Sequence, residues 1–189
     1  MVSMEGEAPE TVVVFSDADA AAKLSMKQEY FDHIRKVNDV FYDQIKISDQ
    51  KAAYIFTFMI AFLVSSADVR AAFALTRYTM ADLPLLFASF VLAVGVTVAL
   101  VSAILVVLPR RSAVSTSLFW GTWPVQRTRF QAAADANDGD YLFGEYVTNA
   151  DTLASIASAK YRFVSIAFRS LVIAVLAYLL VLFFTGSSV

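Results

Sequence analysis

Long stretches of apolar residues divide this chain into membrane-spanning and polar parts. The longest stretch, Leu83 to Leu108, contains no charged residue and is closed by Pro109, Arg110 and Arg111. A transmembrane helix needs roughly 20 apolar residues to cross a hydrocarbon core of about 30 Å. This stretch is long enough to cross with some tilt, so we expect it to form a transmembrane helix. Four small residues in this stretch can let a neighbouring helix approach closely: Ala93, Gly95, Ala99 and Ser102.

Two other apolar segments predict further crossings. Ala52 to Ala67 predicts the first crossing, although as a helix it spans only about 24 Å. Together with the stretch at 83–108 it forms a predicted helical hairpin over residues 52–108. Residues 163–185 predict the third crossing, within a helix that we place from about Ala150 to Phe184.

Residues 18–51 have the periodicity of an amphipathic helix. They follow an acidic leader, residues 1–17, that we expect to be disordered. Packing of the apolar stripe on the same chain is the simplest interpretation. A coiled-coil-like contact between copies is an alternative. Binding to a membrane surface fits less well, because the polar face is not predominantly basic. The stripe consists of Leu24, Phe31, Ile34, Val37 or Val40, Phe41 and Ile45.

Residues 109–162 are predicted to connect the hairpin to the last crossing and to include the start of the last helix. The segment is mixed and polar beyond Arg111, and it contains an Asp-rich turn from Asp135 to Asp140. The side chain of Asn149 or Asp151 can cap the last helix.

Composition narrows the class of protein. The chain is 58% apolar and only 17% charged, which is too apolar for an ordinary soluble domain. A net charge of −2 gives no basic field for nucleic acid. The absence of cysteine excludes disulfides and thiolate metal sites. His33 is the single histidine and is expected to face solvent. With no glycine-rich phosphate loop and no nucleophile elbow, we expect no enzyme activity, no metal site and no resident cofactor.

The distribution of Lys and Arg predicts the orientation. Six precede the first crossing, two lie in the hairpin connection, six lie in the second connection and none follows the third crossing. By the positive-inside rule, the N-terminus and the second connection face the cytoplasm. The prediction is an all-α, multi-pass membrane protein with three transmembrane helices and long cytoplasmic helical extensions.

Arg169 lies inside the third crossing, about 10 Å beyond Phe163. A charge at this depth is costly, which leaves three alternatives: snorkelling to the interface, pairing with Asp49, or lining an aqueous path. Because three helices hardly enclose an aqueous path, we expect a homo-oligomer in the lipid bilayer.

Four short motifs resemble those of the Pycsar-type membrane effectors of bacterial antiphage defence. They occur in the order that the family shows and in register with the apolar segments, and the resemblance covers residues 38–185. The first matches the family's Asp-x-Lys-Ala signature at the opening of a membrane helix. The motifs are Asp49-Gln50-Lys51-Ala52, Pro109-Arg110, Leu118-Phe119-Trp120-Gly121 and Ala159-Lys160-Tyr161.

The resemblance implies an inner-membrane effector switched on by a cyclic pyrimidine mononucleotide, cUMP or cCMP. A partner nucleotide cyclase makes this messenger during phage infection, and activation impairs the membrane and stops growth before the phage matures. The chain has no recognisable separate cyclic-nucleotide-binding domain. Direct sensing therefore requires that the cytoplasmic helices form the pocket themselves.

Cations and aromatic residues at the cytoplasmic ends are the candidates for such a pocket, because a phosphate needs a cation and a base can stack on a ring. The alternative is that the cations set topology and the tryptophans anchor the chain at the interface. Asp49 and Arg169 are candidate intramembrane or gating residues. The candidate ligand-binding residues are Lys51, Arg110, Arg111, Trp120, Trp123, Arg127, Arg129 and Lys160.

Two other functions fit the same topology. One is a non-enzymatic membrane adaptor that uses the helix at 18–51 as its interaction face. The other is a ligand-independent pore or holin-like protein.

Overall fold

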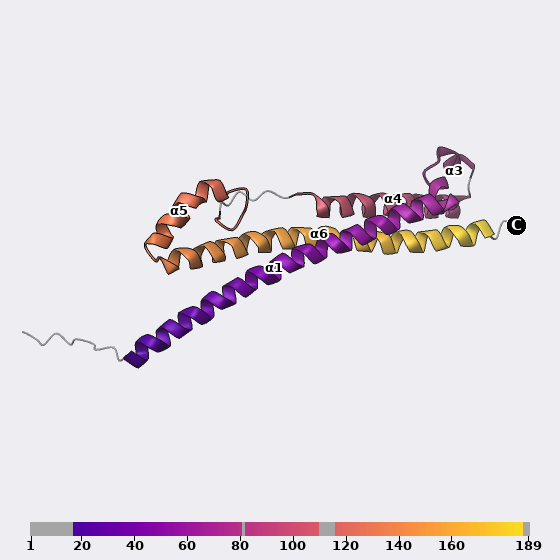
Figure 1. Ribbon diagram of the computed structural model, residues 1–189. Coiled ribbons are helices and arrows are strands. Elements are labelled where there is room, and N and C mark those ends of the chain that lie inside the picture. The colour runs from indigo at the N-terminus through magenta and orange to yellow at the C-terminus, as the bar shows by residue number, and fades with distance from the viewer. Residues whose placement is uncertain (1–16, 81, 110–115, 187–189) are drawn as a thin grey trace, which may run out of the picture.

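The computed structural model describes residues 17–80, 82–109 and 116–186, and these residues form helices and connecting turns without a strand (Figure 1). Three long helices are apolar enough to cross a membrane, as predicted. They are α1 (Asp17–Ser65), α4 (Leu83–Val107) and α6 (Gly139–Gly186); the shorter helices are α2 (Ala67–Ala71), α3 (Leu75–Met80) and α5 (Trp123–Asp135).

The predicted amphipathic helix and the first crossing form one continuous helix, α1. No Pro or Gly interrupts the chain between Asp17 and Ser65. The stripe that packs inward recurs every three or four residues and passes the predicted boundary at Gln50 without a break, as in a coiled-coil seam. Its buried and half-buried members are Phe31, Ile34, Asn38, Phe41, Ile45, Ser48, Ala52, Ile55 and Met59.

α1 ends at Ser65 and does not continue through Asp68 and Arg70. Ser66 adopts an extended conformation, with φ −95° and ψ 121°. Its hydroxyl accepts a hydrogen bond from the Val69 N–H at 3.3 Å, which satisfies a donor in the first turn of α2. The cap therefore starts a new helix, and α2 and α3 make the short connection to α4.

The last helix begins at Gly139, so its predicted start near Ala150 is wrong. Asn149 and Asp151 lie inside α6 and do not cap it. The Asp138 carboxylate instead accepts a hydrogen bond from the Tyr141 N–H at 3.0 Å. The predicted Asp-rich turn is present between α5 and α6, and Asn137 adopts a left-handed φ of 53° there, a conformation that Asn tolerates better than most residues.

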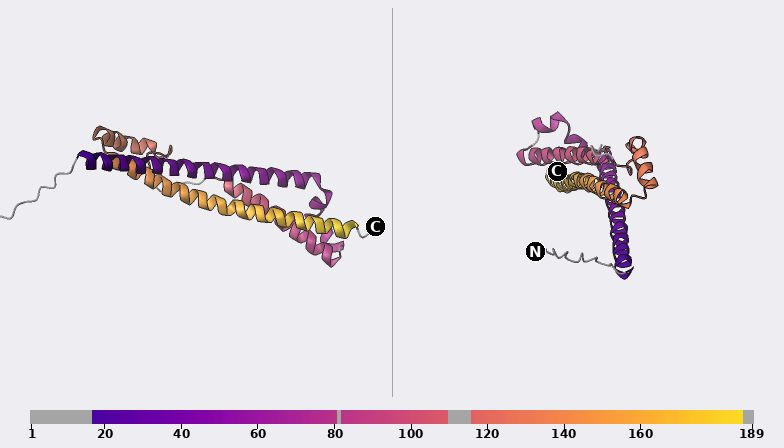
Figure 2. Two further views of the ribbon diagram at one scale, coloured as in Figure 1. Left: turned by 90° about the horizontal axis from the view of Figure 1, so that it is seen from below. Right: turned by 90° about the vertical axis from the view of Figure 1, so that its left-hand side faces the viewer.

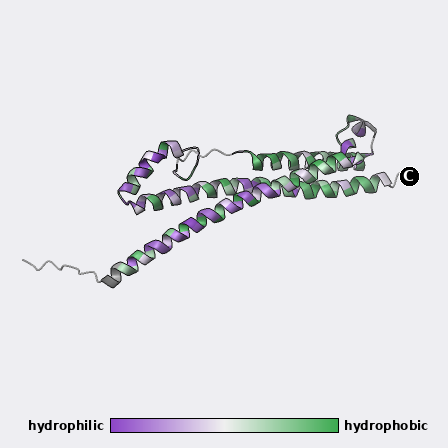
Figure 3. Ribbon diagram, viewed as in Figure 1, coloured by the Kyte–Doolittle hydropathy of each residue, from purple (hydrophilic) through white to green (hydrophobic). Residues whose placement is uncertain are grey.

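The three long helices form a bundle at one end and a two-helix extension at the other. α1 and α6 run parallel to each other, and α4 runs antiparallel to both beside the C-terminal part of α6 (Figures 1 and 2). Apolar residues dominate the bundle, whereas polar residues gather on the extension and on α5 (Figure 3). The extension is formed by residues 17–51 of α1 and 139–162 of α6, which lie on the same side of the bundle.

Small residues allow α4 and α6 to pack closely. A Cβ atom added to Gly95 would lie 3.1 Å from the Ala174 Cβ. Without bulky side chains between them, two membrane helices gain van der Waals contact along their backbones. The structure confirms the close approach predicted for the small residues of α4, of which Gly95, Ala99 and Ser102 are buried.

The close α4–α6 contact predicts that a larger side chain at Gly95 destabilises the protein. Gly95→Leu should lower the free energy of unfolding by about 1–3 kcal/mol, because overpacking forces the helices apart. The measurement is thermal unfolding in detergent, followed by far-ultraviolet circular dichroism. Val98→Leu adds one methylene on the exposed side of the same helix and should leave the melting temperature unchanged. Equal stability of Gly95→Leu and the wild type would contradict this packing.

Candidate functional site

Two polar contacts join α1 and α6 in the extension. In the first, Asn38 is buried and its side-chain N–H groups donate to the carbonyls of Ile34 and Tyr146, at 2.9 and 3.0 Å. Asn38 Oδ1 accepts a hydrogen bond from Asn149 Nδ2 at 2.7 Å. Thr116, in the segment before α5, donates to Asn149 Oδ1 at 3.4 Å. One amide pair, in which Asn38 is buried and Asn149 half-buried, thus joins α1, α6 and the chain that follows α4.

The second contact is an ion pair next to the bundle. Lys160 Nζ donates to Asp49 Oδ1 at 2.5 Å, and the side chains are 8% and 36% exposed. The ammonium of Lys160 is therefore already neutralised within the protein. Because Asp49 pairs with Lys160, it is not the partner of Arg169, which was one of three alternatives. The neighbouring Lys51 lies over the ring of Tyr161 with its Nζ 6.0 Å from the ring centroid.

The predicted aromatic and cationic residues around α5 lie further along the extension. Thr116 contacts Asn149, and the Ser117 N–H donates to Glu145 at 2.5 Å. Asn149 is about 16 Å from Lys160 along α6, by the helical rise. Trp120 is 84% exposed and therefore encloses no ligand by itself.

The predicted ligand-binding residues therefore form two groups. Lys51 and Lys160 lie beside Asp49, whereas Trp120, Trp123, Arg127 and Arg129 belong to the α5 region. Arg129 stacks on Tyr141, with its Cζ atom 5.4 Å from the ring centroid. Arg110 and Arg111 lie outside the described residues, and their place in a site stays a prediction. His33 is exposed on α1, as expected.

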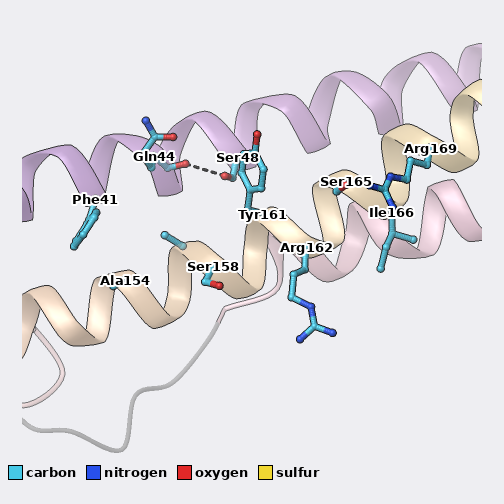
Figure 4. Close-up of a pocket in the computed structure, with 11 residues that line it drawn as sticks. Phe41, Gln44, Ser48, Ala154, Ser158, Tyr161, Arg162, Ser165, Ile166 and Arg169 are labelled. Carbon is cyan, nitrogen blue, oxygen red and sulfur yellow. Dashed lines mark hydrogen bonds between the residues drawn. The ribbon is translucent and has the colours of Figure 1, made fainter.

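A groove of about 630 Å³ follows α6 from the extension into the third crossing (Figure 4). It contains two arginines, Arg162 and Arg169, and neither forms an ion pair with any described residue. Arg162 is one of the six cations of the second connection that predict the orientation, and it was not predicted as a site residue. The spacing of Ser158, Arg162, Ser165 and Arg169 is a detectable signal, since steps of four, three and four place residues on one helix face. The groove is lined by Phe41, Gln44, Ser48, Ala154, Ala157, Ser158, Tyr161, Arg162, Ser165, Ile166 and Arg169.

The groove begins outside the bilayer and ends within it. Gly95 contacts Ala174 in the middle of the antiparallel α4–α6 pair. Val107, the last residue of α4, and Arg162 are equally far from this contact along their helices, so they lie at the same level. Arg169 lies about 10 Å deeper, by the helical rise.

These features define a multi-pass membrane protein with a largely apolar groove that contains two arginines at the edge of the bilayer. The family model described as Pycsar effector protein domain matches residues 33–187. The match covers both polar α1–α6 contacts and all three apolar segments, and it leaves out residues 17–32 of α1. No curated protein and no solved structure matches the chain. The chain belongs to the Pycsar effector family, and it is a membrane effector of antiphage defence.

The ion pair between buried Lys160 and half-buried Asp49 predicts a penalty for removing one partner. Lys160→Met should lower the free energy of unfolding by about 1–3 kcal/mol, because it leaves the Asp49 carboxylate without its cation. The loss is smaller than for a fully buried pair because Asp49 keeps access to water. The measurement is thermal unfolding in detergent.

A double variant and a surface control show whether the loss of stability comes from the ion pair. Lys160→Met combined with Asp49→Asn should recover part of the lost stability, because no uncompensated charge remains. Lys36→Met, on the exposed side of α1, is the matched control and should change stability little. Identical melting of the Lys160 and Lys36 variants would contradict the ion pair.

Proposed function

We propose that cUMP or cCMP, made by a partner nucleotide cyclase during phage infection, activates this protein to impair the bacterial inner membrane and abort infection. The observation that carries the proposal is the extent of the family match, which includes residues 33–51 and 139–162 of the α1–α6 extension together with the three apolar segments. A messenger bound to the extension acts without any reaction being catalysed. It shifts the protein between two arrangements of the membrane helices, provided that it binds one arrangement more tightly.

The extension faces the cytoplasm in this proposal, where a cyclase product is available. The alternation of Lys and Arg between the connections supports this orientation. The structure agrees with one part of this orientation only, namely that residues 17–51 and 139–162 lie on the same side of the bundle. Both halves of the extension then meet the same compartment.

A homo-oligomer is the proposed active form. In the most apolar stretch of each long helix, only 22% of the residues of α1 and of α6 are buried within one chain, and 39% of those of α4. This outward apolar surface is available to lipid and to other copies. An aqueous path through the bilayer needs more helices than one chain supplies, which favours assembly of several copies.

The adaptor alternative loses the surface on which it was based. That surface is the helix at 18–51, and Ile34 and Phe41 of its apolar stripe are half-buried in the seam that α1 forms with α6 of the same chain. An external partner would have to displace α6 to reach them. The ligand-independent pore differs from the proposed effector in one observable, which is toxicity without a messenger.

Ligand-induced stabilisation tests direct sensing. Full-length protein in detergent is heated with cUMP, cCMP, cAMP or cGMP, and with the linear nucleotides UMP and CMP as controls. We expect cUMP or cCMP alone to raise the melting temperature, because a ligand at 100 times its Kd stabilises the folded state by about 2.7 kcal/mol. No shift with any cyclic nucleotide would contradict direct sensing by this chain.

Growth of the host tests the proposed activity. Expression of this protein together with a cyclase that makes its messenger should arrest growth and depolarise the inner membrane, measured with a potential-sensitive dye. Expression of the protein alone should leave growth and membrane potential unchanged. Equal toxicity with and without the cyclase would favour the ligand-independent pore.

A further inference from the structure

No residue of this chain can provide a negative charge for Arg169 at its depth in the bilayer. The three apolar segments, residues 52–65, 83–107 and 163–186, contain no Asp, Glu or Lys, and Arg169 is their single charged residue. A second copy of the chain therefore cannot offer a carboxylate at this level. Because an unpaired charge inside a bilayer is costly, Arg169 requires an anion or water from outside the protein.

The path of the Arg169 side chain shows where that partner would lie. Side chains in helices lean toward the N-terminus of the helix, which for α6 is the direction of the extension. In Figure 4 Arg169 runs back along α6 toward Ser165. Its guanidinium thus approaches Ser165, whereas Arg162, which lines the groove nearer the extension, points away from Arg169 in Figure 4.

The groove combines positive charge with hydrogen-bond donors and rings. Arg162 and Arg169 lack acidic partners among the described residues, so they raise the affinity for an anion. The hydroxyls of Ser158 and Ser165 lie on the same stripe of α6, and Phe41 adds an aromatic ring at the outer end. The volume of about 630 Å³ is within the range of small-molecule sites, roughly 300–1,000 Å³.

We propose that this groove binds a phosphodiester group, with Arg169 and Arg162 as its cations and the hydroxyls of Ser158 and Ser165 as additional donors. A phosphodiester carries one negative charge on two free oxygens, which a guanidinium can bind in a bidentate manner. Two sources supply this chemistry at the membrane surface: a cyclic mononucleotide and a phospholipid headgroup. Binding of a cyclic mononucleotide in the groove rests on the proposed function, whereas binding of a phospholipid headgroup does not.

The position of the groove connects ligand binding to helix pairing. Ser48 and Tyr161 line the groove, and each is adjacent in sequence to a member of the Asp49–Lys160 ion pair. A bound phosphodiester therefore lies beside the contact that joins α1 to α6. It can favour one arrangement of the two helices by contacting both.

The test compares Arg169→Gln and Arg162→Gln with the wild-type protein, purified in a maltoside detergent that contains no phosphate. Arg35→Gln, an exposed arginine of the same extension, is the matched control. One arm measures binding of cUMP and cCMP by calorimetry. The other measures retention of added phosphatidylglycerol by native mass spectrometry, with a phosphate-free diacylglycerol as reference.

We expect each groove variant to weaken binding of the phosphodiester ligand at least about tenfold, since charge-assisted hydrogen bonds are lost, and Arg35→Gln to bind as the wild type does. Unliganded Arg169→Gln should melt no lower than the wild type, because it removes a charge from the bilayer. Arg169→Lys keeps the positive charge and should recover part of the affinity.

The outcomes separate this inference from the proposed function. Loss of nucleotide binding in the groove variants supports the inference with the messenger as source. If the wild type binds phosphatidylglycerol through these arginines but neither nucleotide, the groove proposal holds with lipid as source and direct nucleotide sensing fails. Unchanged binding of both nucleotides and phosphatidylglycerol by both variants overturns the inference, and direct sensing still stands if the wild type binds cUMP or cCMP.

Discussion

Two polar contacts with the same sequence offset hold α1 and α6 in one register. Asn38 pairs with Asn149 and Asp49 with Lys160, and each pair is separated by 111 residues. The contacts are about three helical turns apart on both helices. Sliding one helix by a turn would break both at once and leave buried amide and ammonium groups unpaired, which is unfavourable away from water. A single polar pair in an apolar helix seam is known to specify register, and this seam has two.

This register links the extension to the membrane. α1 and α6 continue without interruption from the polar contacts into the bundle, where small residues bring α4 against α6. A change in α1–α6 pairing at Asp49 is therefore transmitted along stiff helices to the crossings. The groove with Arg162 and Arg169 lies beside this contact. Its place at the edge of the bilayer suits a ligand that alters the pairing.

Hydropathy predicts the crossings well because a bilayer demands long uncharged helices, and Leu83 to Leu108 meets that demand almost to the residue. The continuity of α1 is harder to predict, because Asn38 and Ser48 are polar residues in its seam and only their spacing reveals the stripe. The early start of α6 depends on the Asp138 cap, which resembles an ordinary turn in sequence. The pairing of Lys160 with Asp49 joins residues far apart in the chain, so no local pattern predicts it. The place of Arg162 on the same face of α6 as Arg169 could have been predicted from the spacing of the two residues.

Cross-linking tests directly whether α1 and α6 of one chain pair in this register. The protein contains no cysteine, so Phe31→Cys and Tyr146→Cys can be introduced together at positions whose rings are 5.4 Å apart between centroids. A short thiol cross-linker is applied in membranes, and the products are identified by gel mobility and peptide mass spectrometry. Pairing in this register predicts an efficient cross-link within one chain, and none for Phe31→Cys combined with Tyr161→Cys. Cross-links only between chains, or equal yields for the two pairs, would contradict it.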